Sequence, residues 1–550
     1  MTGQSRQLTR VLFAMLVAIP CGFLPAQARA LVPAELAPGV VRYALDTGQL
    51  APVIELLPRL NADSADYLTA RTLLNSGQRQ KARALFEQVF AGEFHRAEAA
   101  LELARLAETS KDPSSAVRWY QDAGRVGFGE LRQQAILGLA DTERRQGKTD
   151  RAGQYLASMD DGYWSAVGYM NLAADFARED LNPARAVVAL RVAMAMAAKD
   201  DNPARRRDLL DQLYLRAGYL SVRNEEYDKA IDFLEKVSLE SYYTPQALYL
   251  HGLALSEKGN HRAAMQSWHR AKKFPLAFPG VSDAWLGMGR GYDLAGYPGQ
   301  AGESWLAANS AYQGERVTLG KLAQRVRQES AYKALVEDAR GADIQWFLAD
   351  SRTLTQPRLA YLLRFLESPD AQLAVRRVAR LDDLARTLSA RQHDLDVFIQ
   401  ALASHRASAG QPDGANRQAL AEQHKELNSA LAQLRNQAGG PAQADRLGSL
   451  ERLLRASHQR LTSLEQRLAD RTQALNAQLA QAQELRAGVD RLQMQVRQAR
   501  ATASARLDEQ VLVFVSAEQQ RMVHALDKTE QQIAHLYEYL ALETIGEDAR

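Results

Sequence analysis

The residue types best suited to chemistry in this sequence are paired acids and one glycine-rich run, GMGRG at 287–291. Dinucleotide-binding loops follow a β-strand, whereas this run lies within a predicted helix. The pairs Asp160-Asp161 and Asp382-Asp383 have no partner pattern, and exposed charge or helix capping explains them. Because H-E-x-x-H, P-loop and G-x-S-x-G motifs are all missing from the sequence, we predict no catalytic, cofactor-binding or metal-binding residues. We expect a non-enzymatic protein, with a cell-wall-active enzyme as the less favoured alternative.

The ten histidines are scattered and form no ligand spacing. His251 lies in a predicted repeat helix, where a packed or groove-facing histidine is the favoured interpretation. The others of note lie in predicted helical arms, where we expect them to be solvated: His393, His405, His424 and His458.

The elements that carry these residues are predicted from a recurring pattern of small and large side chains. In each unit a small residue is followed four positions later by a large one, which suits the close packing of two helices. The small residue recurs after 34, 36, 34, 44, 34 and 37 positions. The first members of the seven sets are Ala82, Ala116, Ala152, Ala186, Ala230, Ala264 and Ala301.

Among the glycines in the first helices of these units are Gly218, Gly252 and Gly289. A glycine within a helix costs about 1 kcal/mol relative to alanine. We therefore expect a neighbouring helix to approach closely at these positions. The pattern of the unit at 285–308 and its period of about 34 residues resemble the tetratricopeptide-repeat (TPR) family over residues 62–312.

The resemblance is strongest in the last three repeats and departs from the family at two places. Lys111-Asp112-Pro113 replaces a glycine turn, and residues 199–203 lie in an insertion of about ten residues beyond the family period. The resemblance implies a solenoid whose first helices line a groove for protein partners. Carried over from the family's spacing, the groove residues are Arg105, Tyr219, Arg223, Tyr249, Glu257, Arg290 and Asp293.

The N-terminus has the features of a signal peptide. Arg6 and Arg10 precede an apolar stretch at 11–24, and Ala-Arg-Ala at 28–30 forms a cleavage site. Cleavage after Ala30 would remove Cys21, the only cysteine, so that disulfides and thiolate chemistry are excluded from the mature chain. We therefore expect a periplasmic protein without a stable membrane span; a retained anchor and a lipoprotein signal are the alternatives.

The C-terminal third changes to a seven-residue spacing of apolar residues, which is typical of a coiled coil. Leu381, Leu388, Leu395 and Leu402 follow this spacing, as do Leu420, Leu427 and Leu434, and then a run from Leu447 to Val496. The sequence Gly-Gly-Pro at 439–441 separates two arms of similar length, each on the order of 90–100 Å if helical. We predict an antiparallel hairpin with its tip there, and an intermolecular coil is the rival arrangement.

The predicted fold is all-α: a TPR-type helical solenoid followed by long coiled-coil helices. Its parts are a signal peptide (1–30), an N-terminal helical cap (31–61), a solenoid of about seven repeats (62–312), a helical capping and connecting region (313–370), a coiled coil (371–503), and a C-terminal helix and tail (504–550).

The favoured function is a non-enzymatic periplasmic scaffold that binds protein partners in a cell-envelope complex. The net charge of +3 gives no support to nucleic-acid binding. The combination of repeats and coil is similar to that of envelope proteins beside the Tol–Pal system, with the order of the two parts reversed. The alternative is a structural oligomer that self-associates through the coil.

Overall fold

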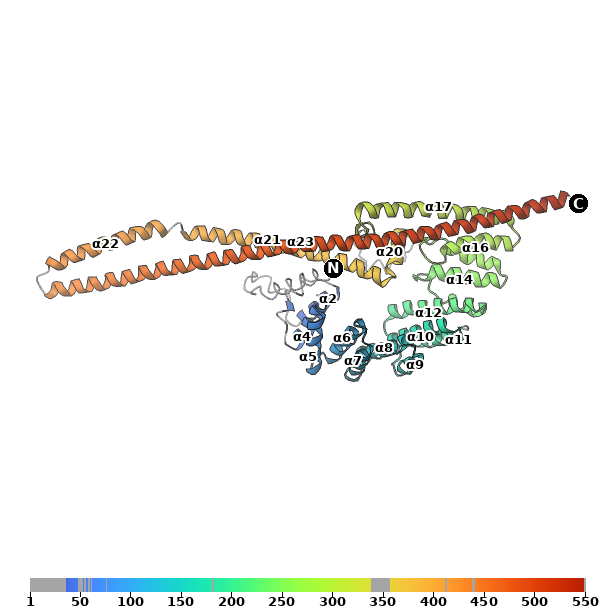
Figure 1. Ribbon diagram of the computed structural model, residues 1–550, viewed down its shortest axis with the longest axis horizontal. Coiled ribbons are helices and arrows are strands. Elements are labelled where there is room, and N and C mark those ends of the chain that lie inside the picture. Colours follow the sequence, from blue (N-terminus) through green and yellow to red (C-terminus); the bar gives the residue numbers. More distant parts are fainter. Residues whose placement is uncertain are drawn as a thin grey trace. The chain divides into compact units, whose positions relative to one another are not determined.

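The computed structural model describes residues 36–47, 53, 56, 57, 60, 62–75, 77–180, 183–337, 357–410, 413–437 and 441–548. In these residues every regular element is a helix, so the prediction of an all-α helical solenoid is confirmed (Figure 1). Among the described residues, helix α2 (Ala37–Thr47) comes first and seven helix pairs follow it. The pairs are α4 (Ala62–Asn75) and α5 (Arg79–Ala91), α6 (Arg96–Thr109) and α7 (Pro113–Val126), α8 (Gly129–Arg145) and α9 (Thr149–Ala157), α10 (Tyr163–Glu179) and α11 (Ala184–Ala197), α12 (Pro203–Arg223) and α13 (Tyr227–Leu234), α14 (Thr244–Glu257) and α15 (His261–Ala271), and α16 (Val281–Leu294) and α17 (Pro298–Glu329).

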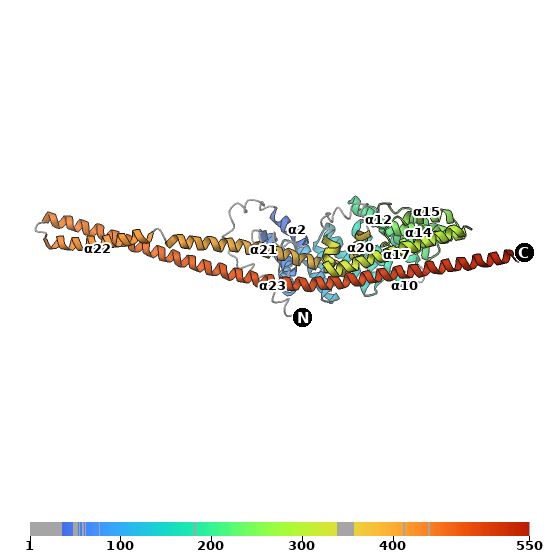
Figure 2. The same cartoon turned by 90° about the horizontal axis from the view of Figure 1, so that it is seen from above.

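The C-terminal part begins with two short elements, the π-helix η3 (Tyr332–Glu337) and α20 (Pro357–Leu366). Three longer helices follow, α21 (Pro369–Gly410), α22 (Asp413–Gln437) and α23 (Pro441–Asp548), and Figure 2 shows them from a second direction. None of the helices in the described ranges is both long enough and apolar enough to cross a membrane.

Six of the seven turns inside the helix pairs share one backbone geometry, and the turn between α10 and α11 includes positions 181 and 182, which lie outside the described residues. A residue with φ near +60 to +80° follows the first helix, and the next N–H donates to a carbonyl five residues back, as in a Schellman motif. Gly259 has φ 79°, and Asn260 donates to the Leu255 carbonyl at 2.9 Å. Lys111 adopts the same conformation at φ 57° without being a glycine, and Asp112 donates to Ala107 at 3.0 Å. The departure from the family pattern at Lys111 therefore leaves the turn unchanged.

The helix glycines lie where the large residue of the second helix packs. A Cβ atom on Gly252 would lie 2.4 Å from Nε1 of Trp268, and one on Gly218 would lie 2.5 Å from Cγ of Leu234. Trp268 is 2% exposed, and its Nε1 donates to the Tyr249 carbonyl at 3.1 Å. The interpretation of these glycines as sites of close helix approach is confirmed.

The insertion at 199–203 lengthens a helix. Helix α12 has 21 residues, whereas the other first helices have 14 to 17. Asn202 caps its start, because the side-chain Oδ1 accepts from the N–H groups of Ala204 at 3.1 Å and Arg205 at 3.2 Å. Pro203 follows at the first helical position, where its missing N–H costs nothing.

The chain divides into two compact units, of which one contains residues 15–380 together with 501–550. Helix α17 runs through position 312 without a break, so no helix end marks the predicted solenoid boundary there. The last repeat is covered by the end of α23, since Leu536 packs with Ala301 and Trp305. Arg521 of α23 also donates to the Leu276 carbonyl at 2.6 Å. Covering of the last repeat is therefore not confined to residues 313–370, because residues of α23, more than 200 positions later in the chain, contribute to it.

The other unit contains residues 381–500, in which two helical arms run antiparallel (Figure 1). Gln392 donates to Asp490 at 2.9 Å, and nearer the far end Arg435 pairs with Glu451 at 3.4 Å. Helix α23 continues without interruption past 503, while the two compact units divide at 500 and 501, close to the predicted boundary between coiled coil and C-terminal helix.

The apolar residues of the arms are buried to very different extents. Leu492 and Val496 are 4% and 1% exposed, whereas Leu420, Leu427 and Leu434 are 48%, 56% and 53% exposed. The seven-residue spacing alone placed those three leucines in the seam, and the structure differs from that expectation. The predicted hairpin tip lies at 439–441, of which only Pro441 belongs to the described residues. The signal peptide lies wholly outside them.

Candidate protein-binding surface

The first helices of the pairs, α4 to α16, carry the residues predicted for partner binding, and we call their outward surface the first-helix face. Tyr219 and Arg223 lie one helical turn apart on α12, and both are exposed. Tyr219 has 44% of its surface in solvent. Within the residues that the structure describes, neither side chain makes a hydrogen bond or an ion pair. Both are therefore available to a partner.

Three more predicted residues lie on the next two first helices. Arg290 of α16 pairs with Glu257 of α14, with 3.7 Å between Nη2 and Oε1. The guanidinium side chain is 58% exposed, so the pair is solvated and contributes little to stability. Asp293 lies on the same helix as Arg290 and is exposed. The structure thus brings Glu257 and Arg290 together as a link between neighbouring repeats.

Tyr249 belongs to the packing between repeats. A Cβ atom on Gly280 would lie 2.8 Å from the Tyr249 Cβ, and the ring packs beside the cluster of Trp268 and Met288. Burial raises the pKa of the Tyr249 hydroxyl to about 12. Replacing Tyr249 would disturb the fold, so it is a poor probe of binding.

His251 is also packed, as the sequence analysis favoured. Its Nδ1 lies 2.8 Å from the Ser267 hydroxyl, and its Nε2 lies 3.4 Å from Glu235. The expectation for the arm histidines fails at His424, which is half-buried. Its ring lies 5.0 Å from that of His458, and its Nε2 lies 3.0 Å from the Leu454 carbonyl.

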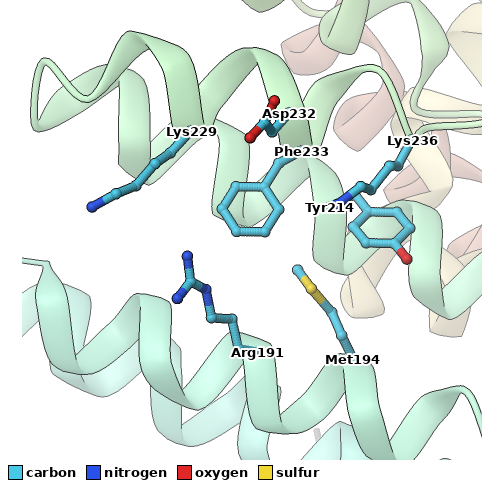
Figure 3. Close-up of a pocket in the computed structure, with 7 residues that line it drawn as sticks. All are labelled: Arg191, Met194, Tyr214, Lys229, Asp232, Phe233 and Lys236. Atoms are coloured by element: carbon cyan, nitrogen blue, oxygen red, sulfur yellow. The ribbon is translucent and has the colours of Figure 1, made fainter.

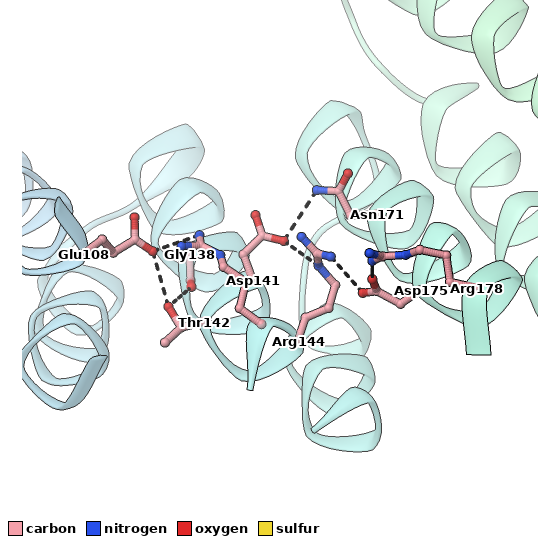
Figure 4. Close-up of polar contacts among 9 residues, drawn as sticks. Glu108, Gly138, Asp141, Thr142, Arg144, Asn171, Asp175 and Arg178 are labelled. Atoms are coloured by element: carbon pink, nitrogen blue, oxygen red, sulfur yellow. Dashed lines mark hydrogen bonds and ion pairs between the residues drawn. The ribbon is translucent and has the colours of Figure 1, made fainter. Parts of the chain in front are cut away.

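The N-terminal part of the first-helix face carries a polar network that the sequence analysis missed (Figure 4). Arg144 of α8 pairs with Asp141 at 3.1 Å and with Asp175 of α10 at 2.8 Å. Asn171 donates to Asp141 at 3.4 Å, and Arg178 also pairs with Asp175. Burial lowers the Arg144 pKa, but the hydrogen bonds to Asp175 and Asp141 more than offset it, so that pKa lies above its usual value.

Arg105, the remaining predicted residue, joins two successive first helices. Its guanidinium pairs with Glu102 at 3.0 Å and donates to Gln134 of the next first helix at 3.1 Å. Such bonds between side chains of successive first helices have no local sequence signature. A signal was present only in the recurrence of charged residues at equivalent positions of successive repeats.

The acid pairs singled out in the sequence are held by side chains that lie far from them in the sequence. Gln133 donates to Asp160 at 2.6 Å, Asp161 pairs with Lys199, and Asp382 pairs with Arg500. In the described part of the chain, no cluster of three or more acidic, histidine or cysteine side chains could hold a metal.

The glycine-rich run at 287–291 is a packing surface. A Cβ atom on Gly287 would lie 3.0 Å from the Trp268 ring, and one on Gly291 would lie 2.6 Å from Cγ of Met265. Gly287 and Gly291 therefore lie against the preceding repeat, within a helix as the sequence analysis expected.

No protein-family model matches the chain, and the comparison with curated proteins gives no match. Among solved structures, the chain is similar to the MamA protein, with 21% identity over 32% of this chain and 91% of that one, at a TM-score of 0.25. It is also similar to a tetratricopeptide repeat protein from Parabacteroides merdae, with 15% identity over 48% and 98% of the two chains, at a TM-score of 0.26. A third similar structure, the Cut9–Hcn1 heterotetramer of the APC/C, has 14% identity over 48% and 50%, at a TM-score of 0.29. None of these likenesses assigns a partner to this chain.

Proposed function

We propose that the protein is a non-enzymatic scaffold that binds a protein partner on the first-helix face of its later repeats. The observation that carries the proposal is the contrast along that face. Around Arg144 the polar side chains satisfy one another, whereas Tyr219 and Arg223 stand exposed and without bonds to the described residues. Tyrosine and arginine are the residue types that most often supply binding energy at protein interfaces.

The chemistry of the surface indicates what kind of segment would bind. The Tyr219 ring offers apolar area with a hydroxyl at its edge, and the Arg223 guanidinium offers several donors to a carboxylate. Arg290 could leave its solvated ion pair with Glu257 and pair with an acid of the partner, because such an exposed pair contributes little free energy. A peptide or helix that carries an apolar residue near an acidic one suits this surface.

The two antiparallel arms would serve as a second contact or as a spacer. Their pairing through Gln392 and Asp490 within one chain supports an intramolecular coiled coil. A long helical hairpin can reach a component that the repeats do not touch, because it extends about 1.5 Å per residue.

The proposed setting is the bacterial periplasm, in a cell-envelope complex. Support comes from the N-terminal sequence, in which Arg6 and Arg10 precede an apolar stretch and an Ala-Arg-Ala site. Cell fractionation with mass measurement of the purified chain tests this part. A periplasmic chain that begins at Leu31 is expected, and a cytoplasmic chain with its first 30 residues would contradict export.

One observation favours a second candidate, a structural oligomer. Leu420, Leu427 and Leu434 form a stripe along α22 that is about half exposed, and a second copy of the arm could cover it. Light scattering on the mature chain decides between the candidates. A monomer mass that does not change with concentration counts against the oligomer.

The first-helix proposal is tested with the variant Tyr219→Ala/Arg223→Ala in a pull-down from cells that produce the tagged protein. Tyr297→Ala/Arg262→Ala is the matched control, since both of these side chains are exposed away from that face. The proposal expects a partner captured by the wild type and the control and lost from the first variant. Equal capture by all three would refute the proposed face.

A further inference from the structure

A pocket opens between second helices α11 and α13 (Figure 3). Its volume is about 340 Å³, which is within the range of roughly 300–1,000 Å³ that is usual for ligand sites. Arg191 and Met194 of α11 face Phe233 of α13 across it, and Tyr214 of α12 closes one end. The remaining lining residues are Lys229, Asp232 and Lys236.

The floor of the pocket is apolar and aromatic. Phe233 is 7% exposed and packs in the core cluster of this part of the solenoid, with Met194 and Tyr214 against the same cluster. The floor is therefore rigid, because its side chains are fixed by the packing of three helices.

The rim is cationic. The Arg191 guanidinium lies 5.7 Å from the Phe233 ring centre, and the Lys236 ammonium lies 5.7 Å from Phe233 and 5.8 Å from Tyr214. In the part of the chain that the structure describes, Arg191 and Lys236 form no ion pair. Lys229 is compensated by Glu226 at 2.7 Å. Two cations therefore face the pocket with only the aromatic rings as partners.

Asp232 does not cancel this charge. It is the single acid of the lining against three bases, and Figure 3 shows it on the α13 side of Phe233, away from Arg191. An anion placed between α11 and α13 would meet Arg191 and Lys236 while remaining over the aromatic floor.

We propose that this pocket binds a carboxylate carried on an apolar stem, presented by an acidic peptide segment of a partner. The carboxylate would pair with Arg191 and Lys236, and the apolar side chain beside it would cover Phe233, Tyr214 and Met194. The cations give up no existing ion pair to do so, and they would bring the carboxylate against a partly desolvated surface, where such pairs are stronger than in water. This site is separate from the first-helix face and does not depend on it.

The test is calorimetric titration of the full mature chain with the capped peptide Gly-Phe-Glu-Phe-Gly. Saturable binding is expected for the wild type, with at least tenfold weaker binding to Arg191→Ala/Lys236→Ala. The matched control Arg262→Ala/Lys273→Ala removes the same charge from exposed sites outside the pocket and should bind as the wild type does. All four positions are exposed, so thermal unfolding should be similar in the two variants.

Two further titrations make the test decisive. The same peptide with glutamine in place of glutamate should lose binding at least tenfold, because the amide carries no charge. The free acid 3-phenylpropionate should bind more weakly than the peptide. Equal loss of binding in the pocket and control variants would overturn the proposal, because the loss would then follow from net charge alone. Binding of the free acid without binding of the peptide would also overturn it, because the ligand would then be a small acid.

Discussion

The indole of Trp305 occupies the space that a side chain on Gly289 would need, since a Cβ atom there would lie 2.2 Å from Nε1. Trp305 is 2% exposed, and its Nε1 donates to the Leu286 carbonyl at 3.2 Å. The same arrangement joins Gly252 to Trp268 one repeat earlier. A glycine and a tryptophan 16 positions apart therefore fix how closely the two helices of a repeat approach.

We predict that Gly289→Ala destabilises the last repeat by about 1–3 kcal/mol, because the added methyl group must displace the indole or separate the helices. Gly314→Ala is the control, since no atom lies within 4 Å of a Cβ at this helical position. The control should be neutral or more stable, by up to about 1 kcal/mol. Urea unfolding followed by tryptophan fluorescence measures both, and equal effects at the two glycines would contradict the packing argument.

The end of α23 should protect the last repeat. Leu536 is 7% exposed and packs with Trp305, so Leu536→Ala should cost about 2–3 kcal/mol and speed amide hydrogen exchange in the α17 segment around Trp305. Leu542→Ala removes a leucine that is 70% exposed on the same helix and should leave exchange unchanged. If Leu536→Ala leaves exchange in α17 as it was, α23 does not cap the repeat.

Glu315 should make the stability of this unit depend on pH. Burial raises the pKa of the Glu315 carboxyl, which accepts from the Tyr361 hydroxyl at 2.6 Å; Arg521 lowers that pKa and Glu518 raises it. Since the folded-state pKa lies above the ordinary value of 4.5, the protonated form stabilises the fold below that value, and this stability is lost as the pH rises through the folded pKa.

Glu315→Gln, which keeps a neutral acceptor for Tyr361, should therefore raise the unfolding midpoint at pH 7 by roughly 2 °C. The gain should vanish near pH 4. Glu303→Gln, at an exposed glutamate of the same helix, serves as the control. A gain of the same size at both pH values would show that charge burial is not its cause.

The arms should crosslink within one chain. The side chains of Gln392 and Gln493 are joined by a hydrogen bond of 2.9 Å. In a chain without Cys21, Gln392→Cys/Gln493→Cys treated with a short bismaleimide should give a crosslinked monomer. The control Gln392→Cys/Thr472→Cys moves the second thiol along α23, about 30 Å from position 493, and should stay uncrosslinked. Dimers as the main product of the first variant would favour intermolecular pairing.

The repeats could be predicted from sequence because their determinants are local. The alanines, the glycines and the large residue four positions on all act within one helix pair, so a period near 34 residues reveals them. Lys111 shows that the turn depends on backbone conformation, which a non-glycine residue adopts there without a sequence signal.

The contacts that sequence did not reveal join distant parts of the chain. Nothing near Leu536 indicates that it packs on Trp305, and the bond from Arg521 to the Leu276 carbonyl spans 245 residues. The residues of the candidate site show the same difference between local and distant determinants. Tyr219 and Arg223 are exposed, whereas the packing of Tyr249 and the network of Arg144 depend on neighbouring repeats.

The central claim is that a protein partner binds the first-helix face of the later repeats. Photocrosslinking in cells from a benzoylphenylalanine at Tyr219, compared with one at Arg262 on the second-helix side, tests it most directly. The account predicts a discrete crosslinked product at Tyr219 that Arg223→Ala abolishes, and none at Arg262. The same product from both positions, or from Arg262 alone, would contradict the account.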